Sequence, residues 1–126
     1  MKKIIIISLF CILLCGCQDN SIKTSGKITC NDKNTILAYD NNPILIDVRT
    51  KEEYDEYHLD NAINIPYDNI ANDIKNIENI NLDTPIIVYC RSGARSSKAY
   101  EALKKEGYNH IYDLGSINSC NKNTSS

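Results

Sequence analysis

Short apolar runs alternate with segments of helical spacing along most of the chain. The apolar runs are rich in isoleucine and valine and predict strands at residues 28–29, 43–48, 62–66, 85–89 and 111–114. The segments between them predict helices at residues 32–39, 51–57, 70–80 and 95–106. Strands that alternate with helices at this spacing are typical of an α/β fold with a parallel sheet.

Three of these helices carry more specific signals. Thr50 and Glu53 have the spacing of a capping box, which gives Glu53 a structural role at the start of the second helix. An isoleucine stripe in the third helix predicts a core-facing side rather than a ligand site, at positions 70, 74, 77 and 80. Gly107 has the position expected just after the end of the last helix.

The first residues resemble a targeting segment rather than part of the fold. A basic start is followed by an apolar run at residues 4–14, which is shorter than the roughly 20 residues that span a membrane. Residues 1–16 therefore predict a signal peptide. The tetrapeptide Leu14-Cys15-Gly16-Cys17 resembles a bacterial lipobox, in which Cys17 is the lipidated position.

The rest of the chain divides accordingly. Residues 17–27 are predicted to be the lipidated N-terminus and a flexible tether, residues 28–120 a single domain, and residues 121–126 a polar tail. More than one acyl chain on Cys17 would give stable anchoring. We therefore expect a lipoprotein on the extracytoplasmic side of a bacterial cell membrane.

The net charge and the cysteine content argue against two classes of function, nucleic-acid binding and metal binding. Without Lys2 and Lys3 the basic count falls from 14 to 12 against 16 acidic residues, so the formal net charge moves from −2 to −4. This balance does not favour a nucleic-acid partner. The predicted mature chain has no CxxC pair and only 2 histidines, so no metal site is expected.

Residues 90–96 form the most informative stretch. Cys90 follows an apolar strand, and a helical pattern begins at Arg95, so the cysteine is placed at the carboxyl end of a strand. A thiol with its ordinary pKa of about 8.5 becomes a good nucleophile only where positive potential favours the thiolate. That potential has three expected sources here: curled loop amides around Gly93, the helix N-terminus, and the charges of Arg91 and Arg95.

Such a loop suits two reactions, sulfur transfer and phosphoryl transfer. Cys90 and Arg95 are separated by 4 residues, whereas cysteine-dependent protein phosphatases use a longer loop to hold a tetrahedral phosphate. The shorter loop fits a terminal sulfur atom better. Tyr89 also stands where a histidine precedes the nucleophile in those phosphatases.

Together these segments resemble a single-domain rhodanese, a thiosulfate or persulfide sulfurtransferase, over about residues 28–120. The matching segments are 47–49, 53–58 running into 62–66, 88–96 and 113–115. The resemblance implies an open parallel sheet of about five strands with helices on both faces. It implies that Cys90 is the catalytic residue and that the binding-loop amides belong to Arg91, Ser92, Gly93, Ala94 and Arg95.

The chain departs from the family pattern in two places. Asn61 replaces a glycine in the turn after His58, where asparagine can also adopt a left-handed conformation. Near the end, Gly115-Ser116 and Cys120 replace the family's paired glycines and a tryptophan, and the usual last helix is nearly absent.

Several supporting residues have two interpretations. Arg95 either helps to hold the anion or pairs with an acidic residue to shape the loop. Asp47 and Arg49 are expected to form a structural ion pair near the same sheet edge, and His58 to stabilise a turn rather than to donate a proton.

The first and last strands are neighbours in the family sheet. The resemblance therefore makes a disulfide between Cys30 and Cys120 a hypothesis, in a compartment that permits one. The competing idea is that Cys120 resolves a persulfide on Cys90.

The expected reaction is a double displacement, in which sulfane sulfur passes from a donor such as thiosulfate through a Cys90 persulfide to cyanide or a thiol. No cofactor is required. The expected partners are a small sulfur-containing substrate, the membrane through the N-terminal lipid, and a protein acceptor as an option. The alternative is a low-turnover carrier or sensing module for sulfane sulfur, and a cysteine-dependent phosphatase is third.

Overall fold

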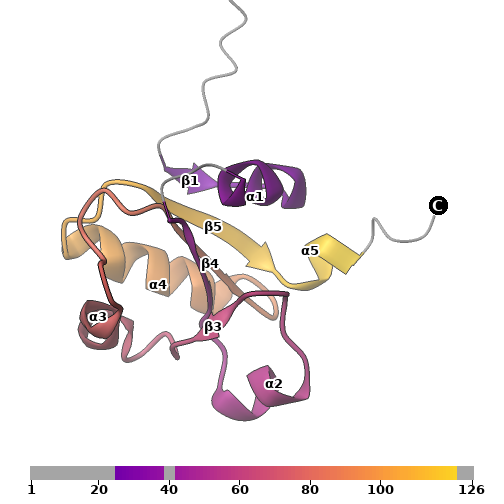
Figure 1. Ribbon diagram of the computed structural model, residues 1–126. Coiled ribbons are helices and arrows are strands. Elements are labelled where there is room, and N and C mark those ends of the chain that lie inside the picture. Colours follow the sequence, from indigo (N-terminus) through magenta and orange to yellow (C-terminus); the bar gives the residue numbers. More distant parts are fainter. Residues whose placement is uncertain (1–24, 39–41, 122–126) are drawn as a thin grey trace, which may run out of the picture.

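The computed structural model describes residues 25–38 and 42–121 and contains a five-stranded sheet in which every pairing is parallel (Figure 1). The spatial order is β1-β5-β4-β2-β3. The strands are β1 Gly26–Lys27, β2 Ile44–Asp47, β3 Ile63–Asn64, β4 Ile86–Cys90 and β5 Ile111–Ser116. This confirms the predicted α/β class with its open parallel sheet.

Helices cover both faces of the sheet. They are α1 Cys30–Leu37, α2 Lys51–Glu56, α3 Ile70–Asp73 with the 3-10 turn η2 Ile74–Asn76, α4 Ala94–Lys105 and α5 Asn118–Asn121. One core cluster joins α3 and α4 to the sheet, and a second cluster joins α1 and the residues beside α2 and α5 to its other face. The connections between parallel strands place these helices.

The central strand β4 shows why two apolar layers form. Its 5 residues are all buried, and alternate side chains enter opposite clusters. Cys90 faces the α4 side together with Val88, whereas Tyr89 lies in the other cluster. A strand buried on both faces has the continuous apolar sequence seen here. The end of β4 is therefore held firmly from both sides.

The N-terminal elements begin earlier than predicted. Strand β1 lies at Gly26–Lys27 rather than at residues 28–29, and Ile28 continues the pairing only through its amide, which donates to the carbonyl of Asp113 at 3.0 Å. Helix α1 starts at Cys30 rather than residue 32, because Thr29 forms a capping box with Asp32. The first described strand thus begins two residues before the predicted boundary at residue 28.

The isoleucine segment is a core element but not one helix. The side chains at positions 70 and 74 are completely buried, and those at 77 and 80 pack against the same cluster. The core assignment is confirmed, but the helical geometry ends at Asn76, and Asn79 adopts a left-handed φ of 64°. Asparagine favours turns over helix interiors, so this Asn-rich stretch supports only short turns.

The last strand is longer than the predicted residues 111–114. Strand β5 extends through Gly115 to Ser116. Its pairing with β4 shifts register between Val88 and Tyr89, and Gly115 adopts a φ of 77° at this irregularity. The last helix is reduced to the four residues of α5. A disulfide joins Cys30 to Cys120 across a Cα separation of 5.2 Å, so the hypothesised pair is bonded in the structure.

The predicted signal peptide and the lipidated Cys17 lie outside the described residues. Within residues 25–38 and 42–121, no helix has the length and apolar character needed to cross a membrane.

Glu53 connects α2 to the start of α4. Besides closing the predicted capping box with Thr50, its carboxylate accepts two hydrogen bonds from the guanidinium of Arg95, at 2.6 Å and 3.1 Å. The bond from Arg95 is the main cause that lowers the pKa of Glu53 to about 2, and the capping bonds from Thr50 act in the same direction. Burial opposes this shift. The ionised carboxylate therefore stabilises the packing of α2 beside the α4 N-terminus.

We predict that Glu53→Gln lowers the free energy of unfolding at pH 7 by about 1 to 2 kcal/mol, after allowance for solvent screening of a partly exposed pair. Because the folded-state pKa of about 2 lies below the ordinary 4.5, the contribution is full above pH 4.5 and is lost as the pH falls towards 2. Urea unfolding across this window measures it. Glu52→Gln, exposed on the same helix, is the control, and an equal pH dependence in both variants would contradict the prediction.

Candidate active site

Cys90 is the last residue of β4 and is completely buried. It is the one cysteine of the described residues that is not in a disulfide. Its Sγ accepts two hydrogen bonds from backbone amides, from Gly93 at 3.0 Å and from Ser96 at 3.3 Å. The sulfur therefore lies in a concave turn of N–H groups, the arrangement that stabilises an anion.

The local sequence explains this turn. Gly93 precedes α4 with a left-handed φ of 101°, a conformation that glycine adopts without a steric cost. Helix N-caps usually supply a side-chain oxygen to the amide of the second or third helical residue. Gly93 has no side chain, and the amide of the third residue, Ser96, donates to Cys90 Sγ instead. The sulfur thus takes the place of the missing cap.

The two loop arginines are directed mainly towards Glu53. Arg95 forms the bidentate pair described above, and this hydrogen bond to Glu53 is the main cause that raises the pKa of Arg95, while burial opposes the shift. The side chain of Arg91 is two-thirds exposed, and its Nε lies 3.6 Å from the Glu53 carboxylate. Of the two readings of Arg95, the structure shows the pairing with an acid that shapes the loop.

Asp47 and Arg49 form a buried pair at the end of β2. Their closest nitrogen–oxygen distance is 2.7 Å, and bonding to Asp47 is the main cause that raises the pKa of Arg49. Arg49 also donates to the carbonyl of Tyr57 at 2.5 Å, at the C-terminal end of α2, and lies 6.0 Å from the ring centroid of Tyr89. These contacts tie α2 to the sheet edge and support the structural interpretation of the pair.

His58 belongs to the turn that follows α2. Its Nδ1 is hydrogen-bonded to the carbonyl of Tyr54 at 2.8 Å, and the two rings are stacked with centroids 3.7 Å apart. Asn61 has a φ of 66°, so it adopts the left-handed conformation expected of it. The contacts of His58 support a turn-stabilising role.

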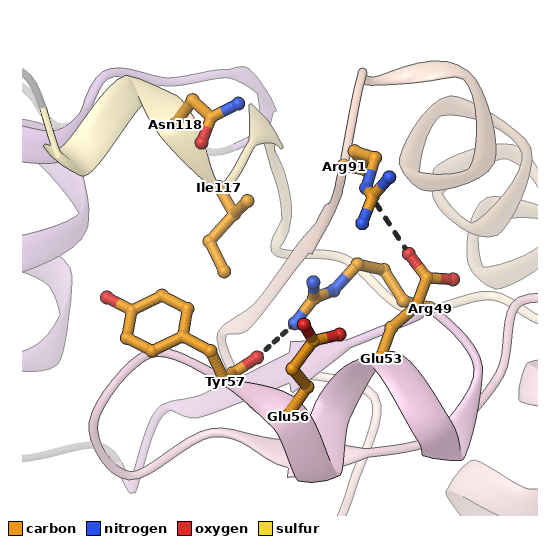
Figure 2. Close-up of a pocket in the computed structure, with 7 residues that line it drawn as sticks. All are labelled: Arg49, Glu53, Glu56, Tyr57, Arg91, Ile117 and Asn118. Atoms are coloured by element: carbon orange, nitrogen blue, oxygen red, sulfur yellow. Dashed lines mark hydrogen bonds and ion pairs between the residues drawn. The ribbon is translucent and has the colours of Figure 1, made fainter.

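A cavity of about 350 Å³ opens beside the loop (Figure 2). Its walls come from α2, the start of the loop and the segment after β5, and its lining residues are Arg49, Glu53, Glu56, Tyr57, Arg91, Ile117 and Asn118. Cys90 does not line it. Arg91, the next residue, stands at its edge in Figure 2, so the cavity lies where a substrate approaching the loop would meet a charged side chain.

Sequence reasoning missed two parts of this site. The capping box identified Glu53, but its partner Arg95 lies 42 residues away, and no local pattern signals that pairing. It also missed Ser116 and Ile117, which donate hydrogen bonds to the carbonyls of Arg91 and Cys90. The sequence Asp113-Leu114-Gly115, part of the resemblance, was the nearest available signal.

No cluster of three or more potential metal-ligating side chains occurs in the part of the chain that the structure describes. The polar groups that surround the loop include its amides, the two loop arginines and Glu53. The Ser96 hydroxyl is engaged with the carbonyl of Gly93 at 3.1 Å.

The sequence and the structure of this chain are similar to those of several known proteins. The thiosulfate sulfurtransferase PspE of Escherichia coli is 38% identical over 72 residues, which cover 57% of this chain and 68% of that protein. A solved structure described as a rhodanese with anions from E. coli has a TM-score of 0.58 and 32% identity, covering 61% of this chain and 89% of the other.

Longer relatives contain a similar segment within a larger protein. An adenylyltransferase and sulfurtransferase of Meyerozyma guilliermondii is 31% identical over 100 residues, which cover 75% of this chain. The chain spans only 23% of that protein, and about a fifth of two further adenylyltransferase relatives. The model of the rhodanese-like domain matches residues 30–122, which include every element from α1 to α5. The chain therefore belongs to the rhodanese-like family.

Proposed function

We propose that this protein is a sulfurtransferase that moves sulfane sulfur from a donor such as thiosulfate to cyanide or a thiol through a persulfide on Cys90. The observation that carries the proposal is the pair of amide hydrogen bonds on a buried cysteine sulfur. The related sulfurtransferases support such a role in general.

The reaction follows from these contacts in two displacements. The Cys90 thiolate attacks the outer sulfur of thiosulfate, a new sulfur–sulfur bond forms, and the donor's own sulfur–sulfur bond breaks so that sulfite leaves with the electron pair. Cyanide or a thiolate then attacks the outer sulfur of the persulfide, and the electron pair returns to Sγ. The fixed amides of Gly93 and Ser96 stabilise negative sulfur before and after each step.

The size of the loop favours sulfur over phosphate. Between Cys90 and Arg95 the chain has only Arg91, Ser92, Gly93 and Ala94, and the guanidinium of Arg95 is bound to Glu53. A transferred phosphoryl group needs donors for three oxygens. A single sulfur needs only the few amides that converge on this point, so phosphoryl transfer is the weaker candidate.

A second candidate is a low-turnover carrier that delivers sulfane sulfur to a partner protein. One observation favours it: the matching segment in the longer relatives occurs within chains whose names combine adenylyltransferase and sulfurtransferase. A carrier would accept one sulfur per Cys90 from thiosulfate in a burst and form little thiocyanate from cyanide afterwards. Sustained thiocyanate formation would identify the enzyme instead.

We predict that incubation with thiosulfate adds one sulfur atom to the peptide that contains Cys90. Peptide-resolved mass spectrometry of the full-length chain is the measurement, because the chain contains 6 cysteines. The adduct should be absent in Cys90→Ser, because the hydroxyl is a far weaker nucleophile. Ser97→Ala, an exposed position on α4, should retain it. No adduct on wild-type Cys90 with any sulfane-sulfur donor would refute the proposal.

We place the domain outside the cytoplasm, attached to a bacterial membrane by lipid on Cys17. The support is the sequence pattern of residues 1–17, a basic start, an apolar run and the lipobox-like tetrapeptide. Cys17→Ala should abolish fatty-acid incorporation in growing cells and move the protein from the membrane fraction, because no acyl chains remain to hold it. Cys15→Ala is the matched control. Equal labelling of wild type and Cys17→Ala would exclude this attachment.

A further inference from the structure

The segment after β5 supports the backbone of the reactive loop. Ser116 Oγ donates to the carbonyl of Arg91 at 2.6 Å, and the amide of Ile117 donates to the carbonyl of Cys90 at 2.8 Å. These bonds hold the two residues at which the loop leaves β4. The side chains of Ile117 and Asn118 also form part of the cavity wall (Figure 2). Movement of this segment would therefore affect both Cys90 and the approach to it.

Helix α5, which follows the segment, is too short to hold itself in place. It has four residues, and the amide of its first residue, Asn118, donates to Ser116 Oγ at 3.2 Å. Isolated helices are marginal even at three times this length. Ile117 is buried and anchors one end, while Asn118 and Ser119 are exposed. A further constraint is needed to fix the other end.

The disulfide supplies that constraint. It links Cys120 of α5 to Cys30, the first residue of α1, across 90 residues of sequence. Helix α1 is itself well anchored: Thr29 caps it, and Ile36 is buried against the sheet. Figure 1 shows α1 above β5 and α5 just beyond the end of that strand. A continuous connection thus runs from α1 through the disulfide and residues 116–118 to the loop.

We propose that Cys30 and Cys120 are positioning residues for the Cys90 loop, so that the reactivity of Cys90 depends on the redox state of this pair. The consequence for sulfur transfer rests on the proposed function. Reduction by a dithiol breaks the sulfur–sulfur bond, gives two protein thiols and converts the dithiol to its cyclic disulfide, with two electrons and two protons transferred. Cys90 takes no part in this exchange. Release of α5 then loosens the donors at Ser116 and Ile117.

The test compares the oxidised full-length chain with the Cys30→Ala/Cys120→Ala double variant. Hydrogen exchange resolved by peptide should become at least about tenfold faster at residues 116–118, because local opening costs less free energy without the tether. Alkylation of Cys90 by iodoacetamide at a fixed pH should become slower, because the amides that contact its sulfur are less well fixed. For thiosulfate sulfurtransfer, kcat/KM should fall by about tenfold, with KM rising because the cavity wall moves.

Two controls separate positioning from general destabilisation. Thr84→Ala removes a buried side chain that accepts a hydrogen bond from the amide of Asn81, at the end of β4 opposite Cys90, and should change neither the alkylation of Cys90 nor exchange at residues 116–118. Wild type reduced by dithiothreitol should show the exchange and alkylation of the double variant. After reoxidation it should again show those of the oxidised chain. Peptide-resolved detection keeps Cys90 distinct from the other cysteines.

The outcomes are distinguishable. Unchanged exchange and alkylation in the folded double variant would overturn the positioning role, whatever the sulfurtransferase assay shows. Loss of all secondary structure in both the double variant and the reduced wild type would also overturn it, because the bond would then hold the whole domain. If the wild type transfers no sulfur, the proposed function fails, while exchange and alkylation still decide the role of the disulfide.

Discussion

The main constraint on this structure comes from the proposed reaction, in which the buried sulfur of Cys90 carries negative charge. Burial of a charge is unfavourable unless fixed dipoles or opposite charges replace the lost hydration. Cys90 is completely buried at the end of β4, and the amides of Gly93 and Ser96 provide that replacement. This requirement explains why the loop needs a left-handed glycine and why α4 begins without a side-chain cap.

The same requirement explains the position of Glu53. The loop that follows Cys90 carries two arginines, at positions 91 and 95. Glu53 holds Arg95 in a bidentate pair and lies 3.6 Å from Arg91. Because Glu53 is also fixed by its capping box with Thr50, the helix that follows β2 sets the arginine positions. The amides therefore contact the sulfur, while the guanidinium groups shape the loop and its entrance.

The sequence predicted those features whose causes are local. The continuous apolar run of β4 is buried on both faces, the capping box of α2 formed as predicted, and Asn61 adopted its left-handed turn. Features that depend on distant partners were missed. Ser116 and Ile117 follow the predicted last strand with no local signal of a role, and the pairing of β4 with β5 brings them to the loop carbonyls. The isoleucine stripe predicted burial correctly, but its periodicity could not show that asparagines interrupt the helix.

The disulfide between α1 and α5 shows how stability and geometry can be separated in this fold. In the chain-entropy model, closing a loop of about 90 residues stabilises the domain by about 4 kcal/mol, and this effect acts on the unfolded chain. It would be similar for a bond placed anywhere with the same separation in sequence. The bond between Cys30 and Cys120 differs because it ends three residues after Ile117, whose amide contacts the carbonyl of Cys90. Its effect on the folded state is therefore local, and it falls on the backbone from which the reactive loop begins.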